Sequence, residues 1–165
     1  VKKKKDRIIV NNKIQYSSNS IFSYLEHFTT TDKLGNLVKI DTKGNLIKEN
    51  LNLSAENSID IVDDNLVYLN ENRLTIKGIT VELPFSRYSK PKIFIDSRTT
   101  LVSITDLTNN EIYLYRDNGE LIDGFPIKGS SVIDLRDSDN DGKTEIISMI
   151  DNFSVVSYEI SLNQN

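Results

Sequence analysis

The residues best suited to chemistry lie in an acidic loop at residues 137–145, which reads D-S-D-N-D-G-K-T-E. Acidic side chains stand at loop positions one, three, five and nine: Asp137, Asp139, Asp141 and Glu145. A hard cation such as Ca²⁺ takes about six to eight oxygen ligands, and carboxylates two residues apart on a tightly curved backbone converge on one point. Gly142 permits the sharp turn, and the Lys143 carbonyl would add a backbone oxygen. The spacing therefore predicts one Ca²⁺ site.

The acidic loop differs from an EF-hand. An EF-hand carries a bidentate Glu at loop position twelve, where this chain has Ser148. The residues that follow the loop, E-I-I-S-M-I at 145–150, are typical of a strand rather than a helix. We therefore expect the loop to join two strands of a β-hairpin. The alternative is a solvated turn without metal, because Asp and Asn favour turns by bonding their own backbone.

Catalytic chemistry has little support in the residue types. The chain has no cysteine, which excludes disulfides, thiolate metal sites and cysteine nucleophiles. His27 is the only histidine, and no nucleophile elbow or phosphate-binding glycine loop accompanies it. A carboxylate pair of the kind used by glycoside hydrolases depends on separation in space, which one sequence does not show. We expect that this chain is not an enzyme.

Composition narrows the class of protein. The 165 residues suit one domain, and 20 basic against 24 acidic residues argue against a nucleic-acid binder. No stretch is long and apolar enough to span a membrane. A Ca²⁺ site favours an extracytoplasmic location, in the periplasm, on the outer-membrane surface or as a secreted protein. The chain begins at Val1, so we expect a processed product or a part of something longer.

Short alternating runs of apolar residues recur along the chain and predict an all-β fold. The segment N-L-V-K-I-D-T-K-G-N-L-I at 36–47 aligns without a gap on E-I-Y-L-Y-R-D-N-G-E-L-I at 111–122. The segment at 73–83 is the same hairpin with a shorter turn. A period of about forty residues with four short strands per unit is typical of a β-propeller. We expect a propeller-like array of about four four-stranded blades.

The repeats set the expected domain organisation. Residues 1–12 form a basic arm and a leading strand, and residues 13–165 form the repeat domain, with units at about 13–55, 56–88, 89–128 and 129–162. The leading strand, Arg7–Val10, has two possible places. It completes the last blade beside Phe153–Ile160 and closes a four-bladed ring, or it belongs to the preceding blade of a larger propeller.

The first unit fits the repeat least well. Its expected strands include Ile14–Tyr16 and Ile21–Leu25. A long polar stretch within Phe22–Gly35 is expected to form a loop, where the other units turn quickly. Tyr113 and Tyr115 lie on one face of a single strand, which suits either packing between blades or a stacking platform for a sugar.

The segment Glu111–Ile160 resembles FG-GAP/VCBS-type β-propeller repeats of bacterial exported or cell-envelope proteins. G-F-P at 124–126, S-V-I-D-L at 131–135 and the acidic loop stand in the order that this family uses. The resemblance implies that Ca²⁺ braces the first hairpin of the blade. The corresponding hairpins of the other units read S-S-N-S, V-D-D-N and D-S-R-T, which implies one metal site.

The resemblance also implies a function. Such propellers bind another protein or a glycan, in some cases within an envelope complex, so a non-catalytic interaction module is expected. The alternative is an accessory propeller domain of a larger polysaccharide-degrading envelope enzyme.

Overall fold

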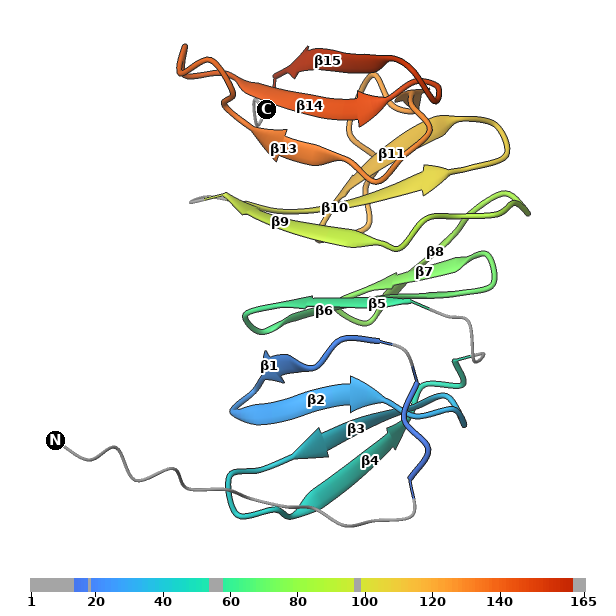
Figure 1. Cartoon of the computed structure of the whole chain (residues 1–165), viewed down its shortest axis with the longest axis vertical. Helices are drawn as coiled ribbons and strands as arrows, with labels where there is room; N and C mark the ends of the chain where they lie inside the picture. The colour runs from blue at the N-terminus through green and yellow to red at the C-terminus, as the bar shows by residue number, and fades with distance from the viewer. Residues whose placement is uncertain (1–13, 18, 54–57, 97–98, 162–165) are drawn as a thin grey trace, which may run out of the picture.

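The computed structural model describes residues 14–17, 19–53, 58–96 and 99–161 (Figure 1). These residues form fifteen strands in four antiparallel sheets, and none of them is helical. The predicted all-β class is confirmed. Because no helix occurs in these ranges, none is available there to cross a membrane.

Each sheet is a meander, in which strands that follow one another in the chain pair side by side. The first sheet contains β1 (Phe22–Tyr24), β2 (His27–Thr31), β3 (Asn36–Ile40) and β4 (Leu46–Asn50). The second contains β5 (Ile59–Val62), β6 (Asn65–Asn70), β7 (Arg73–Ile76) and β8 (Ile79–Glu82). The third contains β9 (Lys92–Asp96), β10 (Thr99–Asp106), β11 (Glu111–Arg116) and β12 (Ile127–Lys128). The fourth contains β13 (Asp134–Arg136), β14 (Thr144–Met149) and β15 (Val155–Ile160).

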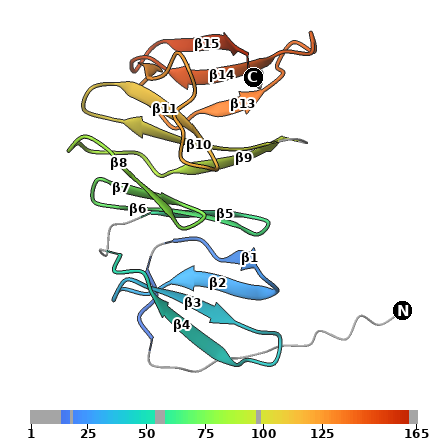
Figure 2. The same ribbon diagram turned by 180° about the vertical axis from the view of Figure 1, so that it is seen from behind.

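The four sheets stack face to face in chain order, with the first and fourth at opposite ends of the molecule (Figures 1 and 2). The described residues therefore form an open array rather than a closed ring of four blades. The reason is that each sheet packs only on its neighbours in the stack, so the two end sheets never meet. The leading strand Arg7–Val10 lies outside the described residues.

Three apolar clusters hold the stack together, one at each junction between neighbouring sheets. The third sheet shows how the period-two alternation of a strand serves two junctions at once. On β10, Val102 and Ile104 join the cluster shared with the second sheet, whereas Leu101 joins the cluster shared with the fourth. Inner sheets are thus buried on both faces, as in stacked β-architectures.

The first unit differs from its prediction. β2 lies inside the stretch that was expected to be a loop, and a two-residue turn at Leu25 and Glu26, both with positive φ, connects it to β1. The predicted strand Ile14–Tyr16 contributes only an isolated bridge, between Tyr16 and Asp32. β2 was expected to be a loop because it is rich in threonine, which is a polar residue. The β-branched side chain of threonine nevertheless fits a buried strand.

Thr29 on β2 offers a first test of this packing. Its side chain is 0% exposed, and its hydroxyl has no hydrogen-bond partner among the described residues. An unpaired buried hydroxyl costs free energy that a methyl group of the same shape does not. Thr29→Val is therefore expected to raise the free energy of unfolding by about 1 kcal/mol in urea denaturation.

Thr75→Val is the matched control, because the buried Thr75 hydroxyl lies 3.2 Å from the Thr80 hydroxyl and loses that bond. It should leave stability unchanged or lower it. Equal destabilisation by the two substitutions would contradict the assignment of Thr29 as unpaired.

Asp106, at the turn between β10 and β11, is a buried anion held by hydrogen bonds. Ser86 Oγ donates to it at 2.5 Å, the Thr108 amide at 2.8 Å, and Asn109 through both its amide and its side chain at 2.9 and 2.8 Å. Burial raises the pKa of Asp106, but these donors outweigh it, and the pKa is lowered overall. The folded state therefore favours the charged form.

Asp106→Asn is expected to lower the free energy of unfolding by about 2 kcal/mol at pH 7, because an amide cannot accept the whole set of bonds. A lowered folded pKa contributes stability that is present above the unfolded value, near 3.9, and is lost as the pH falls through the folded value. The difference between the two proteins should therefore shrink below about pH 4. Urea denaturation at pH 3, 5 and 7 measures it, with the exposed Asp117→Asn as control.

Candidate metal centre

The acidic loop joins β13 to β14 and is closed by the pairing of Arg136 with Glu145. It therefore lies in a β-hairpin, as the strand-like sequence after it predicts. Positive φ angles at Asn140 (62°) and Gly142 (85°) produce its tight curvature. Asn tolerates this left-handed conformation better than most residues, and glycine adopts it freely.

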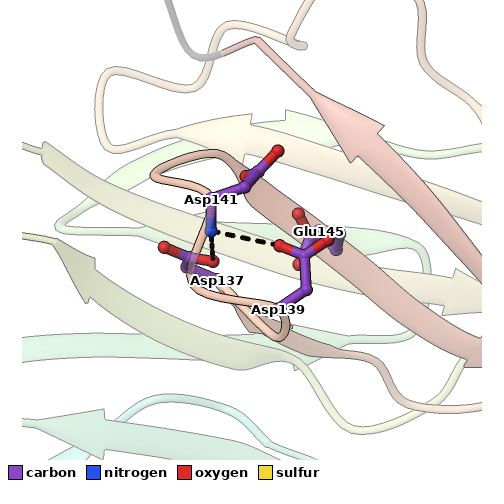
Figure 3. Close-up of side chains that lie close together, drawn as sticks. All are labelled: Asp137, Asp139, Asp141 and Glu145. Carbon is purple, nitrogen blue, oxygen red and sulfur yellow. Dashed lines mark hydrogen bonds between the residues drawn. The ribbon is translucent and has the colours of Figure 1, made fainter.

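The curvature gathers the four predicted acidic side chains at one place (Figure 3). One carboxylate oxygen from each of them lies within 4.8 Å of those of the other three. Within the described ranges, this is the one group of three or more such side chains with ligating atoms close enough to share an ion. The members are Asp137, Asp139, Asp141 and Glu145, of which only Glu145 is buried.

Backbone amides of the loop hold the aspartates. The Asp141 amide donates to Asp137 Oδ1 at 3.1 Å and to Asp139 Oδ1 at 3.2 Å. The Gly142 amide donates to Asp137 Oδ2 at 2.9 Å, and the Lys143 amide to Asp141 Oδ1 at 2.9 Å. These bonds orient carboxylates towards the inside of the turn. They would equally support a turn without metal.

Glu145 is the buried member of the acidic group, and hydrogen bonds hold its side chain in place. Its side chain is on a strand, it is 8% exposed, and its Oε2 accepts hydrogen bonds from the Ser138 amide at 2.7 Å and the Ser138 hydroxyl at 2.6 Å. Ser138 stands at loop position two and was not among the predicted site residues. The contact depends on the path of the folded hairpin, and the sequence carried no signal for it.

The Lys143 side chain pairs with acidic side chains, whereas the prediction for this residue concerned only its backbone carbonyl. Its Nζ lies 2.7 Å from Glu159 Oε2 on β15 and 3.7 Å from Asp141 Oδ2. The hydrogen bond with Glu159 raises the pKa of Lys143, and the charges of Glu159 and Asp141 add to the effect. The loop keeps a formal charge of −3 from its four acidic and one basic side chain. Such a concentration of negative charge favours a bound cation.

The other sequence candidates are not part of this centre. His27 begins β2, and its Nδ1 lies 2.5 Å from the Leu25 carbonyl oxygen across the turn. The rings of Tyr113 and Tyr115 stack with centroids 6.3 Å apart. Tyr115 belongs to the apolar cluster between the second and third sheets, and Tyr113 packs against it. Burial raises the pKa of Tyr115 to about 12. Both rings pack between the second and third sheets. Because Tyr115 is buried there, the alternative of a stacking platform for a sugar is wrong for this residue.

Comparison of the chain with family models, curated proteins and solved structures gave no match.

Proposed function

We propose that this chain is a non-catalytic, Ca²⁺-binding interaction module of the β-propeller type, belonging to an exported or cell-envelope protein. Its loops bind another protein or a glycan. The observation that carries the proposal is the convergence of four carboxylates in one hairpin loop. An interaction module needs rigid loops on a stable scaffold, and a bound cation supplies the rigidity at the turn.

The arrangement of strands supports the propeller part of the proposal. Among the described residues, three meanders of four strands and one of three stack through apolar faces, in chain order. Propeller blades are four-stranded meanders that pack in this way around an axis. An open array of stacked sheets suits part of a larger propeller.

The donor set supports Ca²⁺ over other ions. All side-chain donors in the centre are carboxylate oxygens, whereas zinc prefers nitrogen and sulfur. Mg²⁺ requires a near-ideal octahedron and gives up its water reluctantly, so a loop of several carboxylates and a carbonyl suits the larger ion. Since a solvent-exposed site of this kind is weak, it would be filled where Ca²⁺ is abundant, which favours an extracytoplasmic location.

Calorimetric titration of Ca²⁺ into chelator-treated protein tests the proposal. We expect one ion per chain, much weaker binding of Mg²⁺, and affinity at least about tenfold lower in Asp139→Asn, because one charged ligand is lost. Asp63→Asn is the matched control, since Asp63 occupies the corresponding hairpin turn of the second sheet with φ 51°. No binding by the parent chain, or equal loss in both variants, would refute the proposal.

A further inference from the structure

The turn that follows β11 carries the one Asn-Gly pair of the chain, Asn118-Gly119. The Arg116 amide donates to the Glu120 carbonyl at 2.8 Å and the Gly119 amide to the Arg116 carbonyl at 3.0 Å, which closes a three-residue hairpin loop. Gly119 takes the left-handed conformation, with φ 83°, and Asn118 is exposed. Asparagine is chemically labile, and a following glycine leaves its own backbone nitrogen unshielded because it has no Cβ. The pair is therefore a candidate for covalent change.

The Asn118 side chain folds forward over Gly119. Its Oδ1 accepts a hydrogen bond from the Glu120 amide at 3.0 Å, and its Nδ2 donates to Glu120 Oε2 at 2.9 Å. This Asx-type turn places Cγ of Asn118 beside the Gly119 nitrogen. The Glu120 amide thus donates to the oxygen on which negative charge develops when that nitrogen attacks Cγ, and a donor at such a position stabilises the charge.

The same turn lies against the second sheet. A Cβ on Gly119 would come within 3.1 Å of the Ile79 side chain and 3.2 Å of the Val81 side chain, both on β8. Asp117 Oδ2 lies 2.8 Å from Nζ of Lys77, in the turn between β7 and β8. The turn after β11 therefore joins the third sheet to the second.

We propose that Asn118 is a site of spontaneous deamidation whose product weakens this contact between the third and second sheets. Hydroxide removes the proton of the Gly119 amide, and the nitrogen forms a bond to Asn118 Cγ. The bond from Cγ to Nδ2 then breaks, and the nitrogen leaves as ammonia with a proton from water, which regenerates hydroxide. Hydrolysis of the resulting succinimide ring adds one water and yields either aspartate or isoaspartate.

Both products change the turn. A carboxylate at position 118 cannot donate to Glu120, and it adds a third negative charge to those of Asp117 and Glu120. In isoaspartate, the backbone also runs through the former side chain, so the loop gains one methylene group and no longer fits a three-residue hairpin. We therefore expect either product to weaken the contact with β8.

Three other asparagines serve as controls within the same chain. Asn52, Asn110 and Asn140 are exposed and have positive φ angles of 52°, 54° and 62°, but the residues that follow them carry side chains. The full chain is incubated in its folded state at pH 7 and pH 9, digested, and measured by mass spectrometry of its peptides. We expect conversion of amide to acid to concentrate at Asn118 and to be faster at pH 9, because hydroxide deprotonates more of the Gly119 amide.

Asn118→Asp carries one product in the normal linkage and tests the effect on the contact. Backbone amide exchange in β8 should be faster in this variant than in the parent chain, because the strand opens more readily when the turn against it is disturbed. Asn110→Asp is the matched control and should leave this exchange unchanged, since Asn110 lies in the turn at the other end of β11.

Conversion at Asn118 no faster than at the three control asparagines would overturn the proposal. Conversion that is faster at Asn118 in urea alone would overturn it as well, because the folded turn would then protect the residue. Unchanged exchange of β8 in Asn118→Asp would refute the effect on the contact. None of these readouts depends on Ca²⁺, so this proposal and the proposed function fail separately.

Discussion

Saturating Ca²⁺ is expected to stabilise the folded chain by about 3 kcal/mol at a hundredfold excess over the dissociation constant. Four carboxylates held within 4.8 Å of one another repel each other without a cation, and a ligand that binds only the folded state stabilises it by mass action. For a chain of 165 residues, this corresponds to a rise of about 6–12 °C in the melting temperature. Thermal melts with chelator and with Ca²⁺ measure it.

Asp139→Ala should abolish this response, because it removes a charged ligand from the centre of the loop. Asp63→Ala, in the corresponding turn of the second sheet, should retain the full response, since it is not part of the acidic group. Equal melting temperatures with and without Ca²⁺ in the parent chain would show that the acidic loop is an ordinary turn.

Gly35→Ala is expected to destabilise the first sheet by about 2–5 kcal/mol, the largest effect we predict for one substitution. Gly35 has a φ of 81°, which disfavours any side chain by about 1–2 kcal/mol. A Cβ there would also collide with the backbone of Leu53, meeting its carbonyl oxygen and, at 2.7 Å, its amide nitrogen. Relief requires movement of Leu53, which belongs to the cluster between the first and second sheets, and overpacking of this kind costs about 1–3 kcal/mol.

Gly78→Ala separates the two causes. Gly78 has nearly the same φ, 85°, but a Cβ there meets nothing within 4 Å. It should cost only the conformational part, about 1–2 kcal/mol. Denaturant unfolding of both variants gives the comparison. Equal losses would mean that the segment containing Leu53 does not pack against Gly35 as described.

The fold could be predicted from the sequence where apolar and polar residues alternate along a strand. The second unit is the best example: the hairpin predicted at residues 73–83 corresponds to β7 and β8. Their Ile, Leu and Val residues alternate between polar ones, and a Lys-Gly turn separates them. β2 was missed for the opposite reason, because its buried face is threonine and its turn carries no glycine.

The order of the sheets in the stack follows from the apolar faces of their strands, but these faces do not determine whether the ring closes. Closure depends on the twist and spacing accumulated over four sheets, which no local pattern encodes. The sequence therefore allowed both a closed ring and part of a larger propeller, and the positions of the first and fourth sheets decide against the closed ring for the described residues (Figure 1).

The acidic loop shows what spacing does and does not reveal about a site. Positions one, three, five and nine were enough to predict convergence of the carboxylates, because a tight turn brings alternate residues to one side. The support of Glu145 by Ser138, and the ion pair between Lys143 and Glu159, depend on the tertiary path of the hairpin. Sequence spacing carries no information about contacts of that kind.

A crystal structure of the chain grown with Ca²⁺ would show the occupancy of the acidic loop. We expect one ion inside the loop, identified by its anomalous signal, with oxygen ligands at about 2.3–2.6 Å. The expected ligands are the side chains of Asp137, Asp139, Asp141 and Glu145 and the carbonyl of Lys143. A loop that keeps its amide–carboxylate bonds at saturating Ca²⁺ and holds no ion would contradict it.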